Sequence, residues 1–128
     1  MSAVGFAIEG VLGQLPEPVG TDRVVGGIGV GHGVYEGAAR VVIDFDDLFL
    51  LQAGEVLVTP ATMESFNAML HLVGAIVTDH GSYACHTAIM ARELGFPAVV
   101  GTVNATSRIA NGARIRVDAN SGEVTVIG

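Results

Sequence analysis

The sequence predicts a small α/β domain with a mixed sheet of short strands and two or three helices. Half of its 128 residues are hydrophobic, and valine and isoleucine recur in short runs. The 18 glycines are numerous enough to make tight turns between such strands. Hairpin patterns and strand–helix–strand patterns both occur, and together they favour a mixed sheet over a purely parallel one.

Composition and charge exclude several classes of protein. The formal net charge is −7 with six lysines and arginines, so the chain lacks the basic clusters that bind nucleic acid. The first ten residues contain no positive segment and no long apolar run, which argues against a signal peptide or a membrane span. Cys85 is the single cysteine, so no internal disulfide can form. We therefore expect one cytoplasmic domain without nucleic-acid or membrane partners.

The N-terminal half reads as an arm followed by the domain. Residues 1–20 are rich in glycine and proline and predict an irregular arm, which leaves residues 21–128 for the domain. The glycine-rich residues 24–33 lack the lysine and the spacing of a phosphate-binding loop, so we interpret them as turns between strands. Residues 34–43 form a strand candidate, and residues 44–51 predict a turn followed by a helical turn.

The middle of the chain alternates strand and helix patterns. Residues 55–59 predict a strand that ends at Pro60. Residues 62–73 predict a helix that ends at Gly74. Its apolar positions lie at i, i+3, i+4 and i+7, on one helical face, and are Phe66, Met69, Leu70 and Val73.

The second half begins with a short apolar strand over residues 75–78 and a polar loop over residues 79–84. A helix is predicted to begin at Cys85 or His86 and to end at Leu94. Gly95 and Pro97 then follow in the order typical of a helix C-terminus.

The remaining elements are short. We expect a strand over residues 98–100 and a short helix over residues 104–110. Residues 114–118 and 123–127 predict a hairpin around the turn of residues 119–122.

His86 is the candidate functional residue because a polar loop delivers it to a helix start. Free N–H groups and the helix dipole favour negative charge at that end. A phosphorylated histidine needs one exposed, unprotonated ring nitrogen, and a partner that holds the other. Gly81 permits unusual backbone angles, and Ser82 and Tyr83 add hydroxyl donors. Met90 and Ile89, one turn on, predict an apolar anchor below the histidine.

Other interpretations of this stretch are weaker. An isolated histidine is most often structural or simply exposed to solvent. A zinc site could draw on Asp79, His80, Cys85 and His86, but the usual ligand spacings are absent, and adjacent Cys85 and His86 point apart on a helix. The same divergence argues against a Cys–His nucleophile, and Cys85 is better read as a packing residue. We therefore predict no metal site.

Several segments carry a family resemblance. Residues 78–101, read as TDHGSYACHTAIMARELGFPAVVG, resemble the signature of the phosphohistidine swivelling domain of PEP-utilising enzymes, with PEP synthase and pyruvate phosphate dikinase nearest. Residues 54–62 and 75–78 resemble that family's lead-in, and residues 33–37 and 112–126 resemble its flanking strands.

The resemblance implies a swivelling β/β/α fold in which His86 is transiently phosphorylated. It implies a free-standing carrier that takes a phosphoryl group from ATP or PEP on a partner subunit and passes it to an acceptor. ATP or PEP and magnesium would bind to these partner subunits of a PEP synthase-like system, and no cofactor would bind to this chain. The residues expected to support the phosphoryl group or its loop are Thr78, Asp79, Gly81, Ser82, Cys85, Thr87 and Arg92.

Three segments depart from the family pattern. Ser82 stands where the family usually has a second glycine, Ala84 replaces a residue that usually bears a hydroxyl, and residues 62–66 differ from the usual Thr-Asp-Pro-x-Trp. Two alternatives stay open: a non-catalytic binding or regulatory module that keeps the fold, in which Ser82 and Ala84 mark loss of the site, and, separately, a fragment of a larger enzyme. For Arg92, an ion pair with a neighbouring element is expected rather than a phosphate contact.

Overall fold

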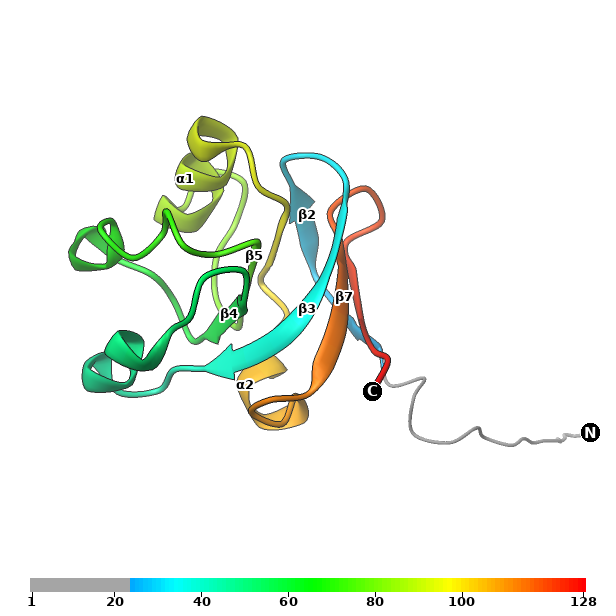
Figure 1. The fold of residues 1–128 in the computed structure, drawn as a ribbon. Helices are drawn as coiled ribbons and strands as arrows, with labels where there is room; N and C mark the ends of the chain where they lie inside the picture. The colour runs from blue at the N-terminus through cyan, green and yellow to red at the C-terminus, as the bar shows by residue number, and fades with distance from the viewer. Residues whose placement is uncertain (1–23) are drawn as a thin grey trace, which may run out of the picture.

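The computed structural model describes residues 24–128 as two layers of strands, with most of the helices gathered on one side (Figure 1). In chain order the elements are β1 (Val24–Gly26), β2 (Ile28–Val30), β3 (Val34–Val41), the 3-10 helix η4 (Phe45–Leu50), β4 (Val56–Thr59), the 3-10 helix η5 (Glu64–Phe66), β5 (Ala75–Thr78), α1 (His86–Leu94), β6 (Ala98–Val100), α2 (Ala105–Arg108), β7 (Arg114–Asp118) and β8 (Glu123–Val126). The predicted arm at residues 1–20 lies outside the described residues.

The strands form one mixed sheet in the order β1-β8-β7-β3-β4-β5-β6-β2. The neighbours β3–β4, β4–β5 and β5–β6 are parallel. The remaining pairs are antiparallel. This arrangement confirms the mixed sheet expected from the sequence.

A single residue, Gly27, connects β1 and β2, which are the strands at the two ends of the order. Its N–H donates to the carbonyl of Gly122 at 2.8 Å. A Cβ on Gly27 would lie 2.4 Å from the backbone oxygen of Val100, so only glycine fits this corner. One nearly continuous strand therefore passes from the edge of one sheet layer to the edge of the other.

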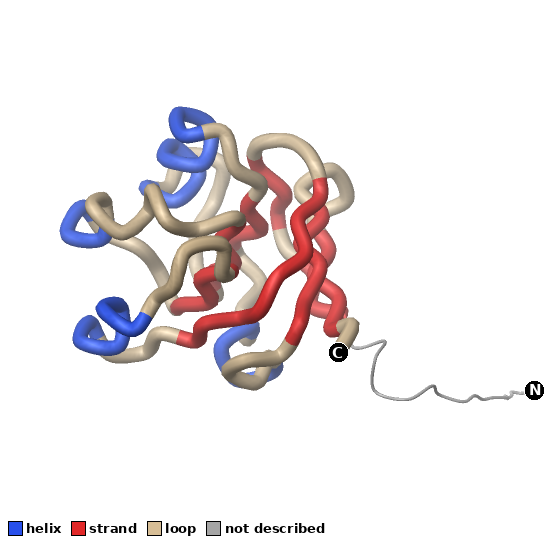
Figure 2. Tube along the Cα trace, viewed as in Figure 1, coloured by secondary structure: helices blue, strands red, loops and turns tan. Residues whose placement is uncertain are grey.

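Hydrophobic cores fill both faces of the central parallel strands. One core lies under η4, η5 and α1 and includes Leu57 and Ile76. The other lies against β7, β8 and α2 and includes Val58, Val77 and Ile115. Alternate residues of a strand face opposite sides, so every residue of β4 and β5 is buried because both sides are covered. Figure 2 shows the resulting layers, with η4, η5 and α1 on one side of the strands.

The short apolar runs and the helix α1 are confirmed. Strands occur within residues 34–43, 55–59, 75–78, 98–100 and the two arms of the C-terminal hairpin. The helix α1 begins at His86 and ends before Gly95, whose φ of 82° places it in the left-handed region typical of a C-terminal glycine. No helix within residues 24–128 is long and apolar enough to cross a membrane.

The predicted helix over residues 62–73 is wrong. The segment contains the short η5 and a series of turns that close through i to i+3 hydrogen bonds, among them Phe66 N–H to the carbonyl of Met63. The expected apolar face still packs on the core, with Phe66 and Leu70 buried. The hydroxyl of Thr62 cannot cap a helix here because it contacts His86 and Thr87 instead.

A two-point ion pair joins β3 to the start of β4. Arg40 Nε and Nη2 each donate to Glu55 at 3.0 Å, and the two side chains are 23% and 16% exposed. Partial burial opposes ionisation of Glu55, but hydrogen bonds from Arg40 and the N–H of Gln52 outweigh it, so the pKa of Glu55 lies below its ordinary value. A lowered carboxyl pKa stabilises the fold above the unfolded pKa and loses that effect as the pH falls.

Replacing Glu55 with glutamine should therefore lower the free energy of unfolding by about 1 kcal/mol near neutral pH. The difference from the unmodified chain should shrink as the pH falls below about 4, where the native carboxylate is itself protonated. Urea denaturation at both pH values measures this. An equal deficit at neutral and acidic pH would show that ionisation of Glu55 does not contribute.

Candidate functional site

The candidate site lies where two parallel strands end and α1 begins. β4 ends at Thr59 and β5 ends at Thr78, and His86 is the first residue of α1. Crevices at the carboxyl ends of parallel strands are the usual ligand sites of α/β sheets. Cys85, the residue before the helix, is extended, and its side chain makes no capping hydrogen bond. The first N–H groups of α1 therefore lack a side-chain cap from Cys85, and the helix dipole favours negative charge at this end.

Both ring nitrogens of His86 have a partner. Nδ1 lies 2.7 Å from Thr62 Oγ1, and Nε2 lies 2.9 Å from Asn67 Oδ1. Thr62 is buried, whereas His86 and Asn67 are half-buried. Nδ1 therefore faces the interior of the domain, and Nε2 faces the more accessible side.

A second threonine extends the inner contact. Thr87 Oγ1 lies 2.6 Å from Thr62 Oγ1, and Thr87 is only 3% exposed. The two hydroxyls form a short relay from the buried start of α1 to the ring of His86. Such a relay fixes the plane of the imidazole and holds Nδ1. The structure thus places Thr87 behind His86, away from the accessible nitrogen.

The loop before α1 is shaped by Gly81. Its φ of 134° is one that side chains rarely adopt, and a Cβ there would lie 2.9 Å from Cys85 Sγ. Thr78 Oγ1 donates to the carbonyl of His80 at 2.6 Å, which fixes the start of the loop. Cys85 packs against the core beneath the helices, as expected for a packing residue.

Ser82 does not disturb this loop. Val103 is the one non-glycine residue of the described part with a positive φ, so Ser82 keeps an ordinary backbone conformation. Its carbonyl accepts from Cys85 N–H, and its hydroxyl accepts from Ala84 N–H at 3.4 Å. The departure from glycine at Ser82 is therefore accommodated without strain.

Arg92 supports the loop rather than joining an ion pair. Its Nη2 donates to the carbonyl of Tyr83 at 2.8 Å. The two ion pairs found within residues 24–128 do not include it, so the expected ion pair is wrong. Ile89, expected to anchor the helix, is 46% exposed, whereas Met90 packs on the core.

Asp79 is directed away from His86. Its carboxylate accepts from Thr106 N–H at 2.9 Å and from the Thr106 hydroxyl at 2.6 Å. Asp79 was expected to support the phosphoryl group or its loop, but its carboxylate instead ties the end of β5 to α2. Asp79 supports the site only through the backbone, where its N–H donates to the carbonyl of Thr59.

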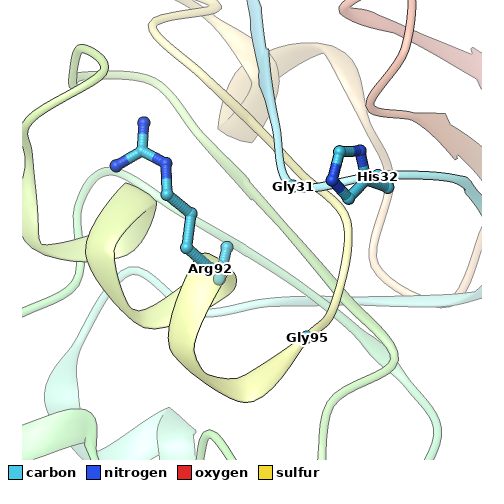
Figure 3. A pocket seen from close by; sticks show the side chains of 5 residues that line it. Gly31, His32, Arg92 and Gly95 are labelled. Atoms are coloured by element: carbon cyan, nitrogen blue, oxygen red, sulfur yellow. The ribbon is translucent and has the colours of Figure 1, made fainter.

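A pocket of about 150 Å³ lies beside α1, away from His86. It is lined by Gly31, His32, Ala91, Arg92 and Gly95. Figure 3 shows Arg92 on the helix and His32 on the loop after β2, with side chains that do not point toward each other. This pocket adds no group to the candidate site.

Sequence reasoning missed two residues of the site, Thr62 and Asn67. Both come from the segment around η5 that was predicted to be a regular helix. They lie 24 and 19 residues before His86 in the sequence, so no local spacing connects them to it. The available signal was the resemblance of residues 54–62 to a family lead-in, which ends on Thr62.

Comparison with known proteins identifies the family. The model for the PEP-utilising enzyme, mobile domain, matches residues 51–122, more than half of the chain. The chain belongs to this mobile-domain family of PEP-utilising enzymes. The matched residues include Thr62, Asn67 and His86.

Two curated relatives illustrate the range of the family. The phosphoenolpyruvate synthase of Aquifex aeolicus is 45% identical over 111 residues, 86% of this chain and 13% of that protein. The rifampicin phosphotransferase of Streptomyces sviceus is 41% identical over 106 residues, 83% of this chain and 12% of that protein. The chain thus spans about one eighth of the length of these relatives.

A solved structure shows the same fold. The solution structure of Enzyme I aligns with 62% of this chain and 33% of its own, at 38% identity and a TM-score of 0.55. The swivelling β/β/α fold expected from the sequence is thereby confirmed.

Proposed function

We propose that the chain is the phosphohistidine carrier of a PEP synthase-like phosphotransferase. His86 takes a phosphoryl group from ATP or PEP on one partner subunit and passes it to an acceptor on another. The observation that carries the proposal is the position of His86 at the start of α1, with Nδ1 held by buried Thr62 and Nε2 on the more accessible side, against half-buried Asn67. Membership of the mobile-domain family supports the same role.

In this proposal Nε2 is the attacking atom. Its lone pair forms the P–N bond while the P–O bond to the donor's leaving group breaks, and the electron pair of that bond stays with the leaving group. Nδ1 keeps its proton and donates it to Thr62 Oγ1, which lies 2.7 Å away. The N–H groups and dipole of α1 then stabilise the negative phosphoryl oxygens.

The donor and its magnesium belong to the partner subunits in this scheme. Within residues 24–128 no group of three or more His, Cys, Asp or Glu side chains is placed to hold a metal ion. The pocket beside α1 is not lined by His86. The chain's own contribution is to hold and orient the imidazole and to supply donors around it.

Radiolabelled PEP or ATP tests the proposal. With the ATP-binding and PEP-binding subunits of a PEP synthase-like system, either donor should label the chain, and the label should be lost in acid and kept in base. Peptide mapping should place the label on His86. Absence of label with both donors, or an acid-stable label on a hydroxyl residue, would overturn the proposal.

Replacing Thr62 with valine should slow labelling about tenfold, because one hydrogen bond that orients Nδ1 is lost. The change keeps the shape of the side chain but leaves the Thr87 hydroxyl without its partner. Initial labelling rates measure the effect. Thr125→Val, on β8, is the matched control and should label at the unmodified rate. Equal rates for both variants would mean that Thr62 does not orient the ring.

A further inference from the structure

Asn67 lies over the ring nitrogen to which the proposed function assigns the attack. Its Oδ1 is 2.9 Å from His86 Nε2, from the turn that follows η5. The backbone N–H of Asn67 donates to the carbonyl of Glu64, so the residue is anchored by its main chain. Its side-chain amide remains free to serve the histidine.

For a neutral imidazole, the contact between Nε2 and Asn67 Oδ1 sets the direction of the other hydrogen bonds in this group. A neutral imidazole carries one N–H, and an amide oxygen only accepts. Nε2 must therefore donate to Asn67 Oδ1, and Nδ1 must accept from the Thr62 hydroxyl. Thr62 in turn accepts from Thr87 Oγ1, 2.6 Å away. With this polarity Nε2 has no lone pair to offer.

We propose that Asn67 is a positioning residue that holds Nε2 of His86 protonated and covered until its side-chain amide turns or moves away. This inference rests on the proposed function, which makes Nε2 the attacking atom. When the amide turns by half a rotation, its NH₂ faces the ring and Nε2 must accept. The ring then changes tautomer by exchange with water: Nε2 releases its proton to solvent, and one proton from solvent binds Nδ1, so the ring stays neutral. The Nδ1–H group donates a hydrogen bond to Thr62 Oγ1, and the Thr62 hydroxyl, which keeps its own proton, rotates to donate to Thr87 Oγ1. The whole relay thus reverses with one amide rotation.

The reversed state is the one that can be phosphorylated. Its Nε2 lone pair is blocked only by the amide, which can withdraw toward the accessible side because Asn67 is half-buried. Nδ1 has no such freedom, since Thr62 and Thr87 are buried. Asn67 therefore controls both the tautomer of His86 and access to its outer nitrogen.

Two measurements on the intact chain test this role without a phosphoryl donor. The first is the ¹⁵N NMR signature of the His86 tautomer. The second is the rate at which diethyl pyrocarbonate modifies His86, followed by peptide mass spectrometry. In Asn67→Leu the Nδ1–H population should rise, and modification of His86 should accelerate about three- to tenfold, the factor set by one hydrogen bond of ordinary net strength.

The control variants separate this role from a structural one. Asn67→Asp presents acceptors only, so it should keep Nε2–H and react at or below the unmodified rate. Asn120→Leu removes an amide contact to Gly33 far from His86 and should change neither measurement. Thermal unfolding checks that each variant is folded.

If Asn67→Leu keeps either the tautomer or the modification rate of the unmodified chain, the role of Asn67 is wrong. If both change as expected but no partner ever phosphorylates His86, the proposed function fails while the control of the ring by Asn67 stands.

Discussion

Replacing His86 with glutamine is expected to abolish phosphorylation of the chain, by roughly a thousandfold or more, while leaving the fold intact. Glutamine retains polar atoms near Thr62 and Asn67 but has no nucleophilic nitrogen. Since His86 is half-buried and outside the two hydrophobic cores, the free energy of unfolding should change by no more than about 1 kcal/mol. Labelling with radioactive PEP and with ATP, in the presence of the partner subunits, measures the effect.

His80→Gln is the matched control for this experiment. His80 belongs to the same loop and is exposed. Its hydrogen bonds use only its main chain: its N–H donates to the carbonyl of Pro60, and its carbonyl accepts from the Thr78 hydroxyl. It should be labelled at the unmodified rate. If His80→Gln loses the label while His86→Gln keeps it, our assignment of the phosphoryl group to His86 is wrong.

Replacing Gly29 with alanine should lower the free energy of unfolding by about 3 kcal/mol or more. A Cβ on Gly29 would lie 2.0 Å from the backbone oxygen of Ala119, and backbone cannot rotate away as a side chain can. Gly26 is the matched control, because its Cβ would meet nothing within 4 Å. Gly26→Ala should stay within about 0.5 kcal/mol of the unmodified chain. Guanidinium denaturation of both variants decides the matter, and similar stabilities would mean that the close approach at Gly29 relaxes.

The parts of the fold that depend on neighbouring residues could be predicted from the sequence. The helix α1 was bounded by Gly95 and Pro97, and the C-terminal hairpin by its own turn. The central strands were recognisable as fully apolar runs because both their faces are covered. In each case the determining signal lies within about ten residues of the element.

The contacts that build the site could not be predicted this way. Thr62 meets His86 across 24 residues, and Asp79 meets Thr106 across 27. For Thr62, helix capping and contact with the histidine compete for one hydroxyl, and only the folded arrangement shows which prevails. The carboxylate of Asp79 could similarly have bonded to His86, but in the fold it accepts from the N–H and the hydroxyl of Thr106. The sequence indicated His86 as a candidate because the loop and the helix start around it are local, and it missed the contacts with Thr62 and Asn67 because those residues are distant in the chain.

The pairing of β1 with β8 has a mechanical consequence. Val24 lies opposite Thr125, so the first strand of the described residues and the last one lie side by side at one edge of the sheet. The helix α1, which begins at His86, lies on the far side of the molecule from that edge (Figure 1). When a rigid body turns about one edge, its far side sweeps the longest arc. A small rotation about β1 and β8 would therefore displace α1, which begins at His86, further than the residues near that edge, with no change inside the domain.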